Sequence, residues 1–211
     1  MSAPLRLTLA DKVEPARACL LIIDVQNDFC SPDGYWGQVA NDRSAVIAMM
    51  PRLHKLIDAA RAAGTLVVFV QAIYDEHFLS APWRERNVRR KLEVARCLSG
   101  SWGADFYEVK PQPTDIVIQK HRYSAFIDTE LDMILRARGV ETLIMTGVAT
   151  NVCVETTARD GFMKDYYIVF ASDCTAAKSA AAQEATLHNI RENFGVVASA
   201  EEIIAAWQTR A

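Results

Sequence analysis

The sequence predicts an α/β fold: a single domain over residues 1–211, with a six-stranded parallel sheet between two helical layers, three layers in all. Two observations favour this class. Short apolar runs without polar alternation recur along the chain, which is typical of strands buried on both faces. Segments with apolar residues at helical spacing separate most of these runs. At 211 residues and 51% apolar composition, the chain is long enough for one sizeable core and short for two domains.

The first part of the chain reads as strand, helix and strand. Residues 18–23 form a continuous apolar run and are expected to be the first strand. Residues 43–63 carry an apolar stripe at helical spacing, and Gly64 follows the stripe as a typical helix end. Pro51 must either begin a helix there or kink it. The second buried strand is expected at residues 65–70.

Residues 71–113 show no clear periodicity, although they include Trp83, Trp102 and a basic cluster from Arg84 to Lys91. A stretch of this length is expected to be a loop region with a short helix, of the kind that often forms a lid or a subunit contact. The basic cluster is interpreted as a solvated face rather than an anion-binding site.

Strand and helix patterns then alternate to the end of the sequence. The remaining strands are expected at residues 115–119, 142–146, 167–170 and 195–197. The helices between and after them are expected at residues 128–138, 150–164, 179–193 and 201–207. Asp128 is the expected N-cap of the first of these helices, and Gly139 follows its end.

The composition argues against several classes of protein. A formal charge of −3 without a long basic run gives no reason to expect a nucleic-acid partner. The longest apolar stretches have the length of strands, so we expect no membrane span, and residues 1–16 lack the apolar centre of a secretory signal. An odd number of cysteines without a CxxC pair favours free thiols in the cytoplasm over disulfides or a zinc site. These cysteines are Cys19, Cys30, Cys97, Cys153 and Cys174.

Three chemically versatile residues follow buried strands. Asp24 comes directly after the first strand, Lys120 after the third and Cys153 shortly after the fourth. Because the carboxyl ends of parallel strands line the ligand crevice of an open sheet, these side chains can meet there. Each also has an ordinary alternative: Asp24 as a turn cap, Lys120 as a surface lysine, and Cys153 as a small core residue.

Cys153 lies in the first turn of an expected helix, after a turn of small residues. Thr150 or Asn151 is expected to cap this helix. Backbone N–H groups at a helix start carry partial positive charge, so we expect them to lower the pKa of the thiol and to hold an oxyanion beside it. Lys120 as an ammonium would favour the thiolate, and Asp24 could take and return a proton.

Three blocks of sequence, in order and each at the end of an expected strand, carry a family resemblance. They are Asp24-Val25-Gln26-Asn27-Asp28-Phe29, Lys120-His121-Arg122-Tyr123-Ser124-Ala125-Phe126 and Gly147-Val148-Ala149-Thr150-Asn151-Val152-Cys153-Val154-Glu155. With these blocks the sequence resembles the isochorismatase-like cysteine hydrolases, from about Ala18 to Trp207. The family's aspartate, lysine and cysteine triad falls on Asp24, Lys120 and Cys153.

The resemblance also implies a backbone feature and an oxyanion hole. A cis peptide bond is implied between Val148 and Ala149, a costly bond outside proline that is usually kept at functional sites. It would turn the Ala149 N–H toward the same pocket as the Cys153 N–H.

Members of the family divide by chemistry. Isochorismate-cleaving members hydrolyse a vinyl ether and do not need a thiol at the position of Cys153, so its presence favours cleavage of a C–N bond. Nicotinamidases resemble the chain in the triad but carry a metal-binding cluster of Asp and His after the second strand. Here that region offers Asp75 and His77 without a second histidine at a suitable spacing. We therefore expect no metal, and no cofactor.

The chain looks most like the hydrolases of ureido and carbamoyl amides, such as ureidoacrylate amidohydrolase and N-carbamoylsarcosine amidohydrolase. The features behind this likeness are Gly34-Tyr35, Tyr74-Asp75-Glu76, Gly100-Ser101-Trp102 and Arg122-Tyr123-Ser124. His121 departs from the residue expected in ureidoacrylate enzymes. The resemblance implies hydrolysis of a small-molecule amide through a thioester, release of ammonia, and a homo-oligomer. The candidate substrate-binding residues are Ala149, Phe29, Tyr35, Tyr74, Trp102 and Tyr123.

Four alternatives stay open on the sequence. Two are enzymes of the same family, a vinyl ether hydrolase of the isochorismatase type and a nicotinamidase-like amidase. A third is a binding or scaffold protein on this fold. The fourth is a redox thiol protein, which would need Cys30 or Cys174 close to Cys153 as a resolving cysteine.

Overall fold

A parallel sheet runs through the computed structural model, which describes residues 5–40, 42–92 and 95–209. Within these residues the sheet has six strands, in the order β3-β2-β1-β4-β5-β6. They are β1 (Ala18–Ile23), β2 (Leu66–Ala72), β3 (Ile116–Lys120), β4 (Thr142–Val148), β5 (Tyr167–Ala176) and β6 (Gly195–Ala198). The chain starts in the middle, builds outward to β3, and then returns to place β4 beside β1. The order of strands therefore reverses between β1 and β4, where open sheets form their ligand crevice.

All six predicted strands are confirmed, and four of them, β2, β4, β5 and β6, are longer than predicted. The apolar run of β4 ends near Thr146, and that of β5 ends at Phe170. Pairing nevertheless continues beyond these residues after a register shift, with Gly147 opposite Thr175 and Val148 opposite Ala176. Backbone pairing extends these strands past the point where their hydrophobic pattern stops.

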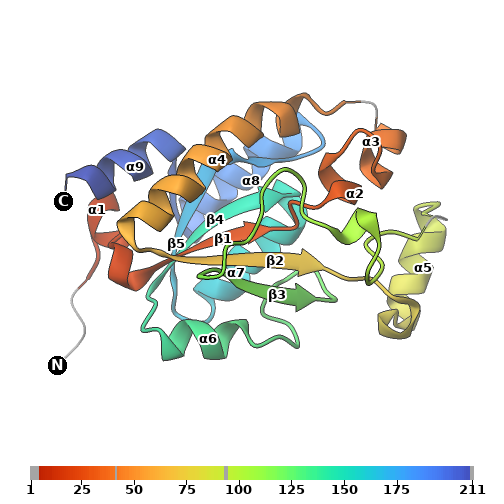
Figure 1. Cartoon of the computed structure of the whole chain (residues 1–211), viewed down its shortest axis with the longest axis horizontal. Helices are drawn as coiled ribbons and strands as arrows, with labels where there is room; N and C mark the ends of the chain where they lie inside the picture. Colours follow the sequence, from red (N-terminus) through yellow and green to blue (C-terminus); the bar gives the residue numbers. More distant parts are fainter. Residues whose placement is uncertain (1–4, 41, 93–94, 210–211) are drawn as a thin grey trace.

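Helices cover both faces of the sheet, which confirms the three-layer arrangement (Figure 1). One face of β1 packs with α4 (Ser44–Ala63) and α9 (Ala200–Gln208), and the short α1 (Leu9–Lys12) contacts α9. The other face packs with α6 (Leu131–Ala137), α7 (Glu155–Phe162) and α8 (Ala180–Asn193). Each face has its own apolar cluster, and the residues of β1 between the two clusters are almost completely buried.

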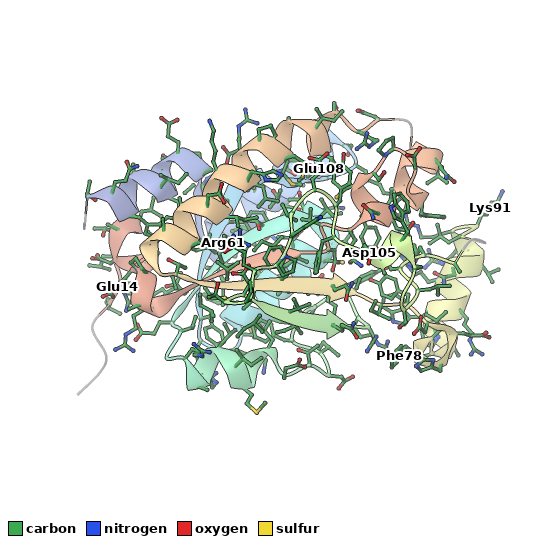
Figure 2. All side chains as sticks on the ribbon, viewed as in Figure 1. Glu14, Arg61, Phe78, Lys91, Asp105 and Glu108 are labelled. Atoms are coloured by element: carbon green, nitrogen blue, oxygen red, sulfur yellow. The ribbon has the colours of Figure 1, made fainter. Side chains whose placement is uncertain are left out.

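The elements near the carboxyl ends of the strands are short. They are α2 (Asn27–Cys30), α3 (Tyr35–Ala40), α5 (Ala81–Arg89) and the 3-10 turns Glu76–Phe78 and Trp102–Ala104; a further 3-10 turn, Pro15–Arg17, precedes β1. The predicted loop region with one short helix is thus confirmed. Figure 2 shows Phe78 and Lys91 with α5 at this end of the molecule, and Glu14 at the opposite end. No helix in the part of the chain described is long and apolar enough to cross a membrane.

Two predicted helix caps are wrong. Asp128 does not cap α6: it has a left-handed backbone with φ +55°, and the helix begins three residues later. The Thr129 hydroxyl instead donates to the Ala125 carbonyl and accepts the Leu131 N–H, so a side-chain turn precedes the helix. Pro51 lies inside α4 and does not begin it.

The second wrong cap is that of the helix expected from residue 150, although the helical segment does begin at this residue. Its first turn, Thr150–Val154, is π-helical, and α7 follows directly. Ala149 is the N-cap residue, and neither Thr150 nor Asn151 provides a capping side chain. The Thr150 hydroxyl is buried and has no hydrogen-bond partner among the described residues. The helix that carries Cys153 is therefore held by its surroundings rather than by a local cap.

Gly64 and Gly147 both have positive φ, but they differ in the space around an added Cβ. Gly64 ends α4 with φ +76°, and an added Cβ would meet no atom within 4 Å. Gly147 has φ +106°, and a Cβ there would lie 2.0 Å from the carbonyl oxygen of Ile23 on the paired strand β1. Gly64 is required only for its left-handed backbone conformation. Gly147 also lacks a side chain where strands β1 and β4 approach each other closely.

We expect Gly64→Ala to lower the free energy of unfolding by about 1 kcal/mol, the cost of a left-handed alanine. Gly147→Ala should lower it by more than about 4 kcal/mol, because strands β1 and β4 must separate. Denaturant unfolding of both variants measures the difference. Equal losses would contradict the close packing at Gly147.

Candidate active site

The structure brings together the three residues that the sequence places at strand ends. Asp24 directly follows β1, Lys120 is the last residue of β3, and Cys153 lies in the π turn after β4. The Lys120 Nζ is 2.8 Å from the Asp24 Oδ2, and the two side chains are 0% and 1% exposed. The Cys153 thiol is close enough to Asp24 and to Lys120 to hydrogen-bond with both. Their roles in catalysis remain a prediction.

Lys120 reaches Asp24 across an intervening strand. β2 separates β3 from β1, and neighbouring strands lie about 4.8 Å apart. The register pairs Lys120 with Ala72 of β2, so the two side chains share a face of the sheet. The small Ala72 leaves room for the lysine side chain to pass. The ammonium also donates to the carbonyl of Arg122 at 3.0 Å, which gives the buried charge a second oxygen partner.

The backbone at Asp24 has an unusual conformation. Its φ of +55° is left-handed, a strained state for a residue other than glycine that clusters at functional sites. Its N–H donates to the Val70 carbonyl at 2.9 Å, and its own carbonyl accepts the Gln26 N–H at 2.8 Å. The turn takes Asp24 out of strand alternation at the end of β1.

Gln26, which was not predicted as a site residue, holds this turn in place. Its amide nitrogen donates to the carbonyls of Ala72 at 3.0 Å and Ala104 at 2.8 Å. Its amide oxygen accepts the Ala72 N–H at 2.8 Å. The completely buried glutamine thus joins the turn after β1 to the end of β2.

The turn before Cys153 contains the cis peptide bond between Val148 and Ala149, which confirms the implication of the resemblance. The Thr157 hydroxyl donates to the Cys153 carbonyl at 2.7 Å and accepts the Ala125 N–H at 3.0 Å. The helix that carries Cys153 is therefore tied to the segment that follows Lys120. N–H groups in the first turn of a helix lack partners within the helix and face whatever lies at its start.

Burial and charge set the protonation of the three groups. Burial raises the pKa of Asp24, and the nearby Lys120 offsets part of this effect. Burial and then the Asp24 carboxylate raise the pKa of Cys153 to about 12. For Lys120, burial works against the charge, but Asp24, Cys153 and Tyr74 together outweigh burial and raise the pKa. The expected lowering of the thiol pKa is therefore wrong: at neutral pH the thiol holds its proton beside a carboxylate that can accept it.

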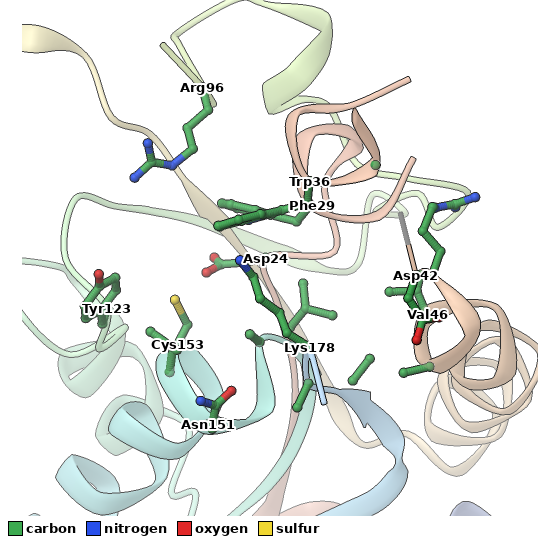
Figure 3. Close-up of a pocket in the computed structure, with 18 of the residues that line it drawn as sticks. Asp24, Phe29, Trp36, Asp42, Val46, Arg96, Tyr123, Asn151, Cys153 and Lys178 are labelled. Carbon is green, nitrogen blue, oxygen red and sulfur yellow. The ribbon is translucent and has the colours of Figure 1, made fainter. Parts of the chain in front are cut away.

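A cavity of about 190 Å³ lies over these residues (Figure 3). Of the predicted substrate-binding residues, four line it: Phe29, Tyr74, Tyr123 and Ala149. Two others do not line this cavity. Tyr35 lies behind the lining and packs against the guanidinium of Arg96, 5.6 Å from its ring centre. Trp102 is 52% exposed, and its carbonyl accepts the Asn27 side chain.

The lining also contains five basic residues that were not predicted as site residues, namely Arg43, Arg86, Arg90, Arg96 and Lys178. Two of them come from the basic cluster that was interpreted as a solvated face. Arg86 lies on α5 and Arg90 is its C-cap residue, four positions later, a spacing that places residues on the same side of a helix. That spacing was the available signal, whereas nothing near Arg96 or Lys178 in the sequence points to the cavity.

The residues considered for a metal are engaged otherwise. The Asp75 carboxylate accepts the N–H and the hydroxyl of Ser99, at 2.8 and 2.6 Å. His77 packs against the ring of Phe78 with 4.0 Å between ring centres. Within residues 5–40, 42–92 and 95–209, no three His, Cys, Asp or Glu side chains are grouped to hold a metal ion.

The other cysteines lie apart from Cys153. All five thiols are free and buried. Cys30 and Cys174 belong to the apolar cluster on one face of the sheet, and Cys153 belongs to the cluster on the other. This arrangement disfavours a resolving role for either residue.

Comparison with known proteins identifies the family. The isochorismatase domain model matches residues 18–202. The chain belongs to the isochorismatase family. Ureidoacrylate amidohydrolase RutB of Stutzerimonas stutzeri (strain A1501) is 38% identical over 203 residues, which cover 90% of this chain and 82% of that protein. RutB of Pantoea ananatis (strain LMG 20103) is 39% identical over 199 residues, covering 88% and 80%.

Two solved structures resemble the chain in fold. A cysteine hydrolase from Pseudomonas syringae pv. phaseolicola 1448A superposes with a TM-score of 0.83 at 31% identity and covers all of both chains. An N-carbamoylsarcosine amidase from Thermoplasma acidophilum shares the fold, with a TM-score of 0.71 at 24% identity over 88% of this chain and 97% of that one. The protein is thus a cysteine hydrolase of the isochorismatase family.

We expect Lys120→Met to lower the free energy of unfolding by about 3–5 kcal/mol, because it leaves the Asp24 carboxylate buried without a partner. The double variant Asp24→Asn/Lys120→Met should lose less than the sum of the single variants, with a coupling of up to about 3 kcal/mol. Denaturant unfolding at pH 7 measures this cycle.

Lys164→Met is the matched control, since Lys164 forms a half-exposed ion pair with Asp132 at 3.2 Å. Its loss should stay below about 1 kcal/mol. If the losses in the free energy of unfolding for the Asp24 and Lys120 variants are additive, their ion pair does not couple strands β1 and β3.

Proposed function

We propose that the protein hydrolyses the C–N bond of small linear amides, with ureido or N-carbamoyl compounds as substrates. The observation that carries the proposal is the Cys153 thiol on a cavity wall beside the buried pair of Asp24 and Lys120. The names of the relatives support the substrate class, since RutB is a ureidoacrylate amidohydrolase.

The first half of the proposed reaction forms a thioester. Asp24 accepts the thiol proton as the Cys153 sulfur attacks the substrate carbonyl carbon, and the C=O electron pair moves to the oxygen. The N–H groups of Ala149 and Cys153 stabilise that oxyanion. When the tetrahedral intermediate collapses, the C–N bond breaks, Asp24 returns its proton to the leaving nitrogen, and ammonia departs.

The second half regenerates the thiol. Asp24, again a carboxylate, takes a proton from a water molecule while the oxygen of that water attacks the thioester carbon. The C–S bond then breaks and the proton moves from Asp24 to the sulfur. Lys120 stays charged throughout, because its pKa is raised by the carboxylate beside it. Its positive charge stabilises whichever of Asp24 and Cys153 is ionised.

The chemistry predicts a complete dependence on the thiol. Cys153→Ala should lower kcat for ammonia release by at least about 10⁴-fold, the scale of losing a nucleophile. Cys174→Ala is the control, because Cys174 is buried in the apolar cluster on the opposite face and should leave kcat within about twofold. Ammonia assays over ureido acids, N-carbamoyl amino acids, biuret-like compounds and nicotinamide provide the measurement.

Two results of this screen would contradict the proposal. Cys153→Ala that keeps its amidase activity would exclude the thioester. Hydrolysis of a vinyl ether that survives Cys153→Ala, without any release of ammonia, would assign the protein to isochorismatase chemistry instead.

The pKa of Asp24 predicts the acid side of the pH profile. Because burial raises this pKa, the carboxylate takes up a proton at a higher pH than a free aspartate does. Activity needs the carboxylate, so kcat should fall on acidification with a midpoint above the ordinary value of about 3.9. Cys153 titrates at about 12, so kcat should stay constant up to about pH 9. A midpoint at or below pH 4 would argue against Asp24 as the base.

A further inference from the structure

The cationic residues on the cavity wall are not used by the proposed reaction. Arg86, Arg90, Arg96 and Lys178 line the cavity. None of them forms an ion pair with a carboxylate among the described residues. By contrast, Arg43, which also lines the cavity, donates to the Cys30 carbonyl and to the Tyr107 hydroxyl.

Arg96 is the most deeply placed of the four. It is only 8% exposed, and the contacts of its guanidinium among the described residues are with aromatic rings. It lies over two aromatic rings, 5.6 Å from the centre of Tyr35 and 5.5 Å from that of Tyr74. The rings position the guanidinium by cation–π contact. They do not occupy its planar fork of N–H donors, whose geometry matches a carboxylate. Figure 3 shows this guanidinium directed into the cavity.

Arg86 is held in the same way. Its guanidinium lies 5.5 Å from the ring centre of Trp83 and 5.3 Å from that of Tyr123. Arg90 is the C-cap residue of α5, and Lys178, two residues after β5, lies over the ring of Trp36. Burial, and then the charges of Arg90, Arg86 and Arg96, lower the pKa of Lys178 to about 8.

The cationic group and the reacting groups share the same aromatic walls. Tyr74 packs against Arg96 and lies within electrostatic range of Lys120, Cys153 and Asp24. Tyr123 likewise interacts with Cys153 and with Arg86. Besides Asp24, one further carboxylate lines the cavity: Asp42, which accepts the Ser44 N–H. Among the described residues, the lining of the cavity therefore carries more positive than negative side chains.

We infer that Arg96, with Arg86, Arg90 and Lys178 around it, binds a carboxylate of the substrate while Cys153 attacks the amide at the other end. This inference rests on the amide hydrolysis proposed above and makes Arg96 a specificity-determining residue. The cavity volume of about 190 Å³ lies below the range of about 300–1,000 Å³ that is usual for ligand pockets, so the substrate is small. The substrates are short ureido or N-carbamoyl acids rather than neutral ureas.

Matched substrates test this preference. N-carbamoylglycine, N-carbamoyl-β-alanine and 4-ureidobutyrate are each compared with the neutral alkylurea of the same chain length, by ammonia release. At least one acid should exceed its alkylurea in kcat/KM by about 10- to 100-fold, the range expected for hydrogen bonds to a charged group. Alkylureas that are hydrolysed as well as the acids would overturn the inference and leave the amidase proposal intact.

Substitutions test whether Arg96 causes the preference for the acid over the alkylurea. Arg96→Gln should lower kcat/KM for the acid by about 10- to 100-fold and change that for the alkylurea by less than about twofold. Arg89→Gln is the control on α5, because Arg89 is exposed and pairs with Glu85 outside the cavity. If Arg96→Gln does not fold, Lys178→Gln and Arg86→Gln replace it, since both residues are partly exposed and should selectively impair the acid. Equal losses for acid and alkylurea would contradict carboxylate binding.

A binding measurement separates this inference from the proposed chemistry. Calorimetry with the Cys153→Ala variant measures the binding of the three ureido acids without turnover. Weaker binding by about tenfold or more on adding Arg96→Gln would support the carboxylate site even if no amide is hydrolysed. Absence of binding for all three acids, or unchanged binding in the double variant, would overturn it.

Discussion

The ion pair between Asp24 and Lys120 is the interaction on which the site depends. Both side chains are almost completely removed from water, which carries a large desolvation cost for each charge. The cost is offset only because the two charges meet at 2.8 Å and the ammonium finds a second oxygen at Arg122. This geometry requires three strands at once: β1 to supply Asp24, β3 to supply Lys120, and β2 with the small Ala72 between them.

The same burial explains why the pKa of the Cys153 thiol is raised, although a thiol at a helix start is expected to have a lowered pKa. Partial charges at a helix terminus favour a thiolate, and so does a nearby ammonium. Here burial and the charge of Asp24 act in the opposite direction and are larger, so the pKa of Cys153 rises. The site therefore holds one transferable proton between sulfur and carboxylate. We infer that the thiolate forms only as the proton moves to Asp24, which limits side reactions of a free thiolate in the absence of substrate.

The aromatic residues near the cavity also hold two of the arginine side chains that line it. Tyr35 and Tyr74 hold Arg96, and Trp83 and Tyr123 hold Arg86. Tyr35, Tyr74 and Tyr123 were expected to contact substrate as apolar walls, but their contacts with arginine show that they also position charge. The segment before β3 thus contributes both rings and cations, although it has little regular structure.

The sequence by itself determined the sheet and the identity of the three strand-end residues. Continuous apolar runs such as residues 18–23 allow only buried strands, and a polar residue at the end of such a run must lie at the edge of the sheet. The start of α6 and the cap expected at Thr150 were not predictable in the same way. There, contacts with distant backbone and local side-chain turns replace the usual capping pattern.

Only the tertiary structure decided how charge is distributed around the cavity. Arg96 and Lys178 come from two separate segments, and nothing local in the sequence distinguishes them from solvated surface residues. The raised pKa of Cys153 likewise depends on a carboxylate that is 129 positions earlier in the chain. Electrostatic effects depend on distance in space and on burial, and a pattern of neighbours along the chain contains neither quantity.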